Sequence, residues 1–173
     1  TIKSSGGNAI YINSENSDSI SFNNIEIFNS EGISLFIEKG NVNVDWLSIT
    51  KGVGPGIVNN TFGMINLNNV NIISNLDNGI INHGHLTASN LFVSQNRHGL
   101  VLTPGISVIT YATITNNGLN GLLIGGGGNK NIMVYIGGRI AKIQTVTHSV
   151  IAILAAPGQG RGQKIYAEVL REK

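Results

Sequence analysis

The chain has 173 residues, 41% of them apolar and 12% charged, with a formal net charge of +2; this suits one domain with its own core and excludes a disordered tail. No cysteine is present, which excludes disulfide bridges and thiolate metal sites. Asparagine (24) and glycine (23) are abundant and proline (3) is scarce, a composition typical of many short strands joined by tight turns.

A glycine followed by an aliphatic residue recurs along the chain. Successive copies are 24, 23, 20 and 22 residues apart. The copies are Gly32-Ile33, Gly56-Ile57, Gly79-Ile80, Gly99-Leu100 and Gly121-Leu122. A strand-only repeat of this length indicates a solenoid, because one unit cannot bury its apolar side without stacking on its neighbours.

A second apolar track keeps the same period, with steps of 22, 23, 21, 21 and 22 residues. Its copies are Ile25-x-Ile27, Leu47-x-Ile49, Val70-x-Ile72, Leu91-x-Val93, Ala112-x-Ile114 and Val134-x-Ile136. Apolar and polar residues alternate within a period, as they do over residues 65–68, and this is the pattern of a strand with one buried side.

The two tracks predict about six stacked coils of about three short strands each, over a length of roughly 30 Å. We expect one buried aliphatic column of Ile33, Ile57, Ile80, Leu100 and Leu122. Corner asparagines are expected to turn the chain, often with positive φ, and to form ladders between coils. These are Asn24, Asn69, Asn78, Asn117 and Asn120.

One eight-residue pattern occurs twice, as Asn68-Asn69-Val70-Asn71-Ile72-Ile73-Ser74-Asn75 and as Asn23-Asn24-Ile25-Glu26-Ile27-Phe28-Asn29-Ser30. Each copy leads into a Gly-Ile pair. From residue 7 to about residue 143 the chain thereby resembles the parallel β-helix repeats of the pectin-lyase-like superfamily. The resemblance implies an all-β, right-handed parallel β-helix. It implies no particular reaction, since such solenoids carry lyases, hydrolases, epimerases, phage tailspikes and adhesive stalks.

The sequence divides into a β-helix over residues 1–143 and a C-terminal cap or assembly segment over residues 144–173. Residues 142–155 are predicted to contain strand, and residues 163–170 a strand or a short helix. A cap is expected because the open end of a solenoid exposes unpaired backbone. The longest apolar run, residues 150–156, is too short to span a bilayer.

Charge is divided unevenly along the chain. Residues 1–129 hold 4 Lys/Arg and 7 Asp/Glu, a net charge of −3, and residues 130–173 hold 7 and 2, a net charge of +5. This split favours an oriented contact, either with an acidic polymer or with another copy of the chain. A solvated basic terminus is the alternative interpretation.

Three histidines are candidate metal ligands. His83 and His85 are two residues apart, so on a strand they point to the same side, and His98 follows about one coil later. Alignment on the glycine track places His85 with Glu38 and Phe62, and His98 with Asn78 and Asn120. Because the three then occupy different columns, we predict no metal site.

Carboxylates are sparse in the repeat region. β-Helix lyases and hydrolases need clustered acidic groups, as calcium ligands or as an acid and base pair. The seven carboxylates are Glu15, Asp18, Glu26, Glu31, Glu38, Asp45 and Asp77, and no two share a column in adjacent coils. Asp77 and Arg97 are expected to be neighbours on consecutive coils, where they would form a surface ion pair.

Other motifs carry less weight. The glycine-rich stretches 125–128 and 158–164 fit neither the phosphate-loop nor the dinucleotide-binding spacing, and we expect flexible turns there. Asn59-Asn60-Thr61 matches a glycosylation sequon, in a chain so rich in asparagine that one match means little.

Aromatic residues are candidates for stacking on sugar rings. The set is Trp46, Phe22, Phe28, Phe36, Phe62, Phe92 and the four tyrosines. Phe92 and Tyr135 are the preferred exposed aromatics, because alignment places both in the outward column of Glu26, Ser48, Asn71 and Thr113.

These observations predict a non-catalytic structural or adhesive module, extracellular or on a cell or virion surface. We expect a homo-oligomer or part of a larger assembly, with polysaccharide as a further partner, and neither nucleic acid nor a membrane span. No catalytic, cofactor-binding or metal-binding residue is predicted. The alternative is a fragment of a polysaccharide lyase or glycoside hydrolase, including the tailspike type.

Overall fold

In the computed structural model, residues 1–3, 5–15, 18–103 and 105–125 are described with their side chains, and further strands by their backbone. The described elements are all strands, and every strand pairing is parallel. They are β1 (Ile2–Lys3), β2 (Ile10–Asn13), β3 (Ser19–Phe28), β4 (Leu35–Thr50), β5 (Ile57–Ile73), β6 (Ile80–Asn82), β7 (His85–Ser94), β8 (Leu100–Leu102), β9 (Ile106–Thr115), β10 (Leu122–Gly125), β11 (Ile132–Ile140), β12 (Ile143–Val146), β13 (Ile151–Ala155) and β14 (Ala167–Leu170). None of the described residues belongs to a helix with the length and hydropathy needed to cross a bilayer.

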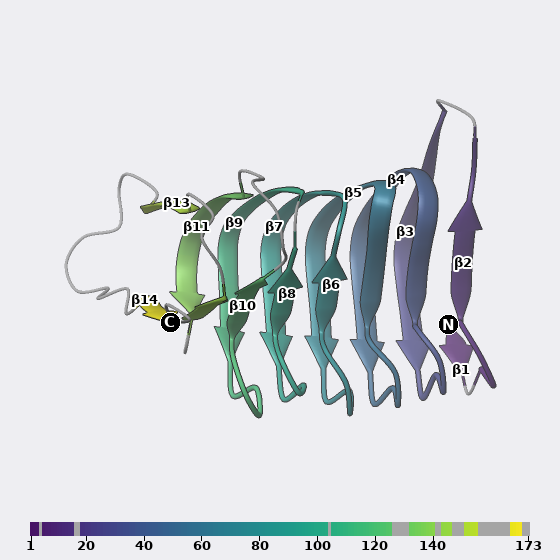
Figure 1. Cartoon of the computed structure of the whole chain (residues 1–173). Coiled ribbons are helices and arrows are strands. Elements are labelled where there is room, and N and C mark those ends of the chain that lie inside the picture. The colour runs from purple at the N-terminus through teal and green to yellow at the C-terminus, as the bar shows by residue number, and fades with distance from the viewer. Residues whose placement is uncertain are drawn as a thin grey trace.

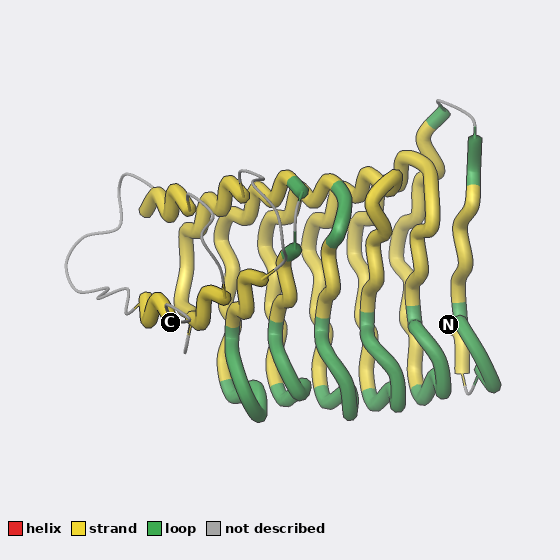
Figure 2. The backbone as a smooth tube through the Cα atoms, in the orientation of Figure 1, coloured by secondary structure: helices red, strands yellow, loops and turns green. Residues whose placement is uncertain are grey.

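The chain forms a parallel β-solenoid (Figure 1), as predicted. Each coil has three faces. The first face includes residues 10–12, 35–37, 57–59, 80–82, 100–102 and 122–124. The second face consists of residues 19–23, 41–45, 64–68, 85–89 and 106–110, and the third of residues 25–28, 47–50, 70–73, 91–94 and 112–115. The loops from the third face to the next coil's first face gather along one edge (Figure 2).

Stacked aliphatic side chains fill the interior. On the third face, Leu47, Val70 and Leu91 lie one above another and are at most 2% exposed. Equivalent columns line the other two faces and join in one apolar cluster. Burial of these columns supplies the main driving force for folding, since one coil alone would leave its apolar side in water.

The first-face column contains four of the five predicted members. Ile57, Ile80, Leu100 and Leu122 stack in register and are fully buried, but the fifth member is Leu35 and not Ile33. The prediction of Ile33 was wrong because the glycine track combines two columns. Gly32 stacks on Gly7 and under Gly54, whereas Gly56 stacks with Gly79, Gly99 and Gly121.

The second track is confirmed for its first five copies and wrong for the sixth. Val134 and Ile136 pair with Ser107 and Ile109 of the second face. Gly138 and Ile140 take the positions opposite Ala112 and Ile114. The register shifts between Ile136 and Gly138, so spacing alone misplaced this copy by one face.

In five successive coils of the described part of the chain, two corners use a left-handed backbone. At the bend between the second and third faces φ is positive at Asn24, Trp46, Asn69, Asn90 and Tyr111. After the third face it is positive at Asn29, Lys51, Ser74, Gln95 and Asn116. Asn24 and Asn69 therefore turn the chain as predicted, while Asn78, Asn117 and Asn120 lie outside these positions.

Inside the second of these corners, an asparagine ladder joins three coils. The Nδ2 of Asn75 donates to the Oδ1 of Asn96 (2.9 Å), and the Nδ2 of Asn96 donates to the Oδ1 of Asn117 (3.3 Å). The backbone N–H groups of Asn75 and Asn96 donate to the same two oxygens, each at 3.0 Å. The ladder therefore satisfies buried backbone groups where the chain leaves the sheet.

The C-terminal strands continue the same stacks. β12 pairs with β10, β13 with β11, and β14 with β12, all in parallel. Residues 167–170 are thus strand and not helix. The role of residues 144–173 as a cap or an assembly segment stays a prediction.

Candidate functional site

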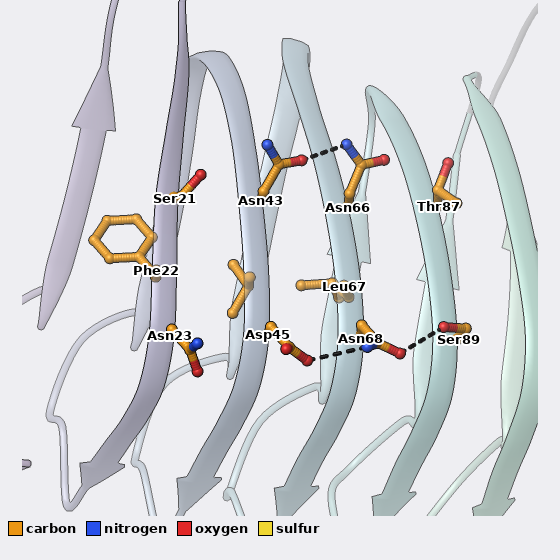
Figure 3. A pocket seen from close by; sticks show the side chains of 11 residues that line it. Ser21, Phe22, Asn23, Asn43, Asp45, Asn66, Leu67, Asn68, Thr87 and Ser89 are labelled. Atoms are coloured by element: carbon orange, nitrogen blue, oxygen red, sulfur yellow. Dashed lines mark hydrogen bonds between the residues drawn. The ribbon is translucent and has the colours of Figure 1, made fainter.

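The outward side of the second face forms an open groove of about 490 Å³, whose lining also includes Phe22, Val44 and Leu67. Two columns of short polar side chains line it over four coils (Figure 3), because alternate residues of a strand point to the same side. One column is Ser21, Asn43, Asn66 and Thr87, and the other is Asn23, Asp45, Asn68 and Ser89.

Hydrogen bonds connect these side chains from coil to coil. In the first column the Nδ2 of Asn66 donates to the Oδ1 of Asn43 (2.7 Å). In the second the Nδ2 of Asn68 donates to the Oδ1 of Asp45 (3.0 Å), and the Oγ of Ser89 donates to the Oδ1 of Asn68 (2.8 Å; Figure 3). The polar groups are therefore held in place before any ligand arrives, which lowers the entropy cost of binding.

Asp45 is the one ionisable residue among those that line the groove. Its Oδ1 accepts hydrogen bonds from Asn68 and Asn69, both at 3.0 Å. The groove thus offers amides, hydroxyls and a single negative charge, and no lining residue is cationic.

Trp46 follows Asp45 directly, at the bend that ends the second face. Its side chain is 59% exposed and its φ is +59°. Three other coils place an asparagine at this bend and one places Tyr111. Asparagine tolerates the left-handed region far better than a bulky aromatic residue does. Neither core packing nor backbone preference explains a tryptophan here, and unexplained strain of this kind concentrates at functional sites.

The aromatic residues preferred from the sequence are not the exposed ones. Phe92 does lie opposite Asn71 and Thr113, but it is partly buried. Tyr135 pairs with Val108 instead, so its assignment to that column was wrong, for the reason already given for its strand. The exposed aromatic residues among those described are Tyr11, Trp46, Phe62 and Tyr111. Trp46 could have been found from the sequence, because it directly precedes a copy of the second track, where asparagine stands in three other copies.

The three histidines have different neighbours. His83 Nδ1 is 2.6 Å from the Oγ1 of Thr103, and His98 shares a column with Asn120, whose Nδ2 is 3.3 Å from its Nδ1. His85 lies between Met64 and Ile106, so its alignment with Glu38 and Phe62 was wrong. The corner before His85 is shorter than the equivalent corner before Met64. No group of three or more potential metal ligands occurs among the described residues.

The acidic residues outside the groove have separate roles. Tyr11 donates a hydrogen bond to Glu38, which raises the pKa of the tyrosine. Glu15 pairs with Lys39 at 3.1 Å. Asp77 and Arg97 are neighbours on consecutive coils, as predicted, and the N–H of Arg97 donates to the backbone carbonyl of Asp77 (3.1 Å).

The side chains of Asp77 and Arg97 do not form the expected ion pair, since Lys39–Glu15 is the salt bridge of the described residues. The Oδ1 of Asp77 instead accepts from the N–H of Asn78 (2.8 Å). Local capping of its own corner therefore holds the carboxylate.

Two remaining motifs are accounted for. Asn59 of the sequon is fully buried, and its Nδ2 donates to the Oδ1 of Asn82 (2.8 Å), so it serves the core and is inaccessible for modification. Gly125 ends β10, and the rest of the stretch 125–128, like the stretch 158–164, lies outside the described residues.

Comparison with known protein families finds no match, and neither a curated protein nor a solved structure matches this chain. The proposed function therefore rests on the residues of the groove.

Proposed function

We propose that the chain is a non-catalytic structural or adhesive module that binds an uncharged polysaccharide along its second face. The observation that carries the proposal is Trp46, an exposed tryptophan in a left-handed corner beside preorganised polar columns. A sugar ring packs its apolar side on an aromatic ring, while amides and hydroxyls exchange hydrogen bonds with its hydroxyl groups.

The charge of the groove selects the class of polysaccharide. Asp45 is its one ionisable group, and it directly precedes Trp46 in the chain. A uronate-rich polymer would bring like charges close to this carboxylate with no lysine or arginine of the lining to offset them. The face therefore favours neutral chains over pectate or alginate.

Sparse acidic groups support binding without cleavage. Glycoside hydrolysis uses two carboxyl groups that flank the scissile bond, and the groove lining supplies Asp45 alone. We place the module outside the cell or on a surface, where such polymers are found, and we propose kinship with pectin-lyase-like solenoids on the repeat pattern.

Trp46→Asn is the decisive test, because asparagine occupies this corner in three other coils. Binding of soluble neutral glucans, xylans and mannans would be measured by calorimetry, with pectate and alginate alongside. We expect a neutral polymer to bind the parent chain, and Trp46→Asn to lose that binding at least tenfold while staying folded. Phe62→Asn removes an exposed aromatic residue outside the groove and should bind normally.

Two results would contradict the proposal. Equal affinity of Trp46→Asn and the parent chain for the neutral polymer would show that Trp46 takes no part in binding. Release of new reducing ends, abolished by Asp45→Asn, would replace the binding module by the lyase or hydrolase alternative.

A further inference from the structure

The N-terminal end of the solenoid presents an unpaired strand edge. β3 pairs along its length with β4 on one side. On its other side β1 covers Ile27 and Phe28 only, and no described strand pairs with residues 19–26 there. Such an edge is a template for a strand of another chain.

Apolar side chains accompany this edge. Ile20, Phe22 and Ile25 continue the columns of Val42, Val44 and Leu47. The three residues of β4 are at most 4% exposed, whereas their counterparts in β3 are only partly buried. The core of the solenoid therefore ends in a partly open apolar surface, and one further strand would cover it.

The opposite end of the molecule carries strands of the same stacks. β13 lies at the end of the stack that begins with β3, and β14 at the end of the stack that begins with β2 (Figure 1). Because all strands of a stack run in one direction, the last strands of one copy can pair in parallel with the first strands of another. No reversal of either molecule is needed.

Charge distinguishes the two ends. Residues 1–31 contain one lysine and four carboxylates, a net charge of −3. Residues 32–129 contain three Lys/Arg and three Asp/Glu and are neutral, and residues 130–173 have a net charge of +5. The four N-terminal carboxylates are Glu15, Asp18, Glu26 and Glu31, all of them exposed. An acidic end and a basic end on either side of a neutral middle favour head-to-tail encounter and oppose head-to-head encounter.

We propose that copies of this chain stack head to tail, with β13 of one copy added in parallel to the edge of β3 at residues 19–26 of the next. β14 of the first copy then faces β2 of the second, so both stacks continue across the junction. The contact joins two different surfaces and leaves each surface free at one end, so association is open-ended and produces filaments. This inference does not depend on glycan binding.

Sedimentation velocity and electron microscopy of the full chain test the proposal at low salt. We expect a concentration-dependent series of species without a limiting size, and unbranched filaments one solenoid wide. Salt at about 1 M reduces the screening length to roughly 3 Å and should shift the series toward monomer.

Matched variants locate the contact. Glu26→Lys with Glu31→Lys makes the N-terminal end basic, and it should weaken association at least tenfold at low salt. Asp77→Lys with Thr61→Lys and Asn71→Lys makes the same total change of charge in the neutral middle, at residues outside the groove, and should leave association unchanged. Ile20→Lys adds a charge to the apolar edge outside the groove and should also reduce filaments. Far-UV circular dichroism confirms that each variant is folded.

Three outcomes would overturn the inference. A single monomeric species at high concentration and low salt excludes stacking. A closed dimer or trimer excludes an open-ended contact. If Glu26→Lys, Glu31→Lys and Ile20→Lys leave association unchanged, the interface lies on another surface. One such surface is the outward column of Phe36, Ile81 and Val101 on the first face.

Discussion

The two sides of the second face follow different rules. The inward columns are aliphatic in the coils where the groove lies, with Val42 above Ile65 and Leu86, each at most 1% exposed. The outward columns change residue type from coil to coil while staying polar, as from Asn66 to Thr87. Inward residues are constrained by close packing in the core, whereas outward residues are constrained only by solvent and by any molecule that binds the surface. The inward residues of each strand therefore determine the fold, whereas the outward residues can vary without disturbing the core.

The interior also admits polar residues under one condition. Asn59 and Asn82 occupy the same inward column as Ile37 and Leu102, and each is fully buried. They are tolerated because the Nδ2 of each donates to a polar group of the next coil, that of Asn82 to the Oγ of Ser107 at 3.0 Å. The Oδ1 of Asn59 is buried without a hydrogen-bond partner. A buried amide without such partners would be costly.

The largest effect is expected for Ile80→Asp, which places an unpaired charge between Ile57 and Leu100. We expect a loss of about 4 kcal/mol or more in the free energy of unfolding, measured by urea denaturation. Ile81→Asp, on the outward side of the same strand, should cost far less. Comparable losses for the two variants would contradict the distinction between the two sides.

Asn96→Leu should come next, because it removes the middle of the buried asparagine ladder. The N–H of Asn75 and the Nδ2 of Asn75 then lose their shared acceptor, and we expect a cost of about 2–3 kcal/mol. Asn66→Leu breaks an exposed ladder on the outward side, and its expected change is within about 0.5 kcal/mol. Urea denaturation of both variants checks the order, and a neutral Asn96→Leu would show that the ladder is dispensable.

A glycine pair gives a smaller contrast. A Cβ on Gly99 would overlap the carbonyl oxygen of Gly121 and the side chain of Ile114, so Gly99→Ala should cost about 1–3 kcal/mol. A Cβ on Gly118 would meet nothing closer than 3.7 Å, so Gly118→Ala should be neutral or stabilising by up to about 1 kcal/mol. Thermal unfolding of the two variants measures this difference, and the reverse order would invalidate the stacking of the glycine column.

The smallest effect has the opposite sign. Trp46→Asn should raise the free energy of unfolding by about 0.5–1 kcal/mol, since asparagine is less strained in the left-handed region. A variant that is more stable but no longer binds glycan would show that Trp46 serves binding at a cost in stability. A destabilised variant would instead assign Trp46 to packing.

Sequence periodicity predicted the solenoid and the inward columns because stacking repeats the same environment in each coil. It misplaced Ile33, His85 and Tyr135 because corners differ in length, and a residue gained or lost between strands is invisible to an alignment on glycine. The candidate site could be predicted from the sequence only in part. The outward polar residues alternate visibly with the core, but the bonds from Asn68 to Asp45 and from Ser89 to Asn68 depend on the register between coils.

Each coil contributes one rung of about 4.8 Å to the second face. The bend that follows this face has the same left-handed backbone in five successive coils. The backbone therefore sets the spacing between neighbouring coils, and the outward side chains set which groups each coil presents. Deleting or duplicating one whole coil would shorten or lengthen the two outward polar columns by one residue each, without changing the distance between the columns. Under the proposed glycan binding, a longer second face would contact more sugar units at once, a property that substitution of single residues cannot alter.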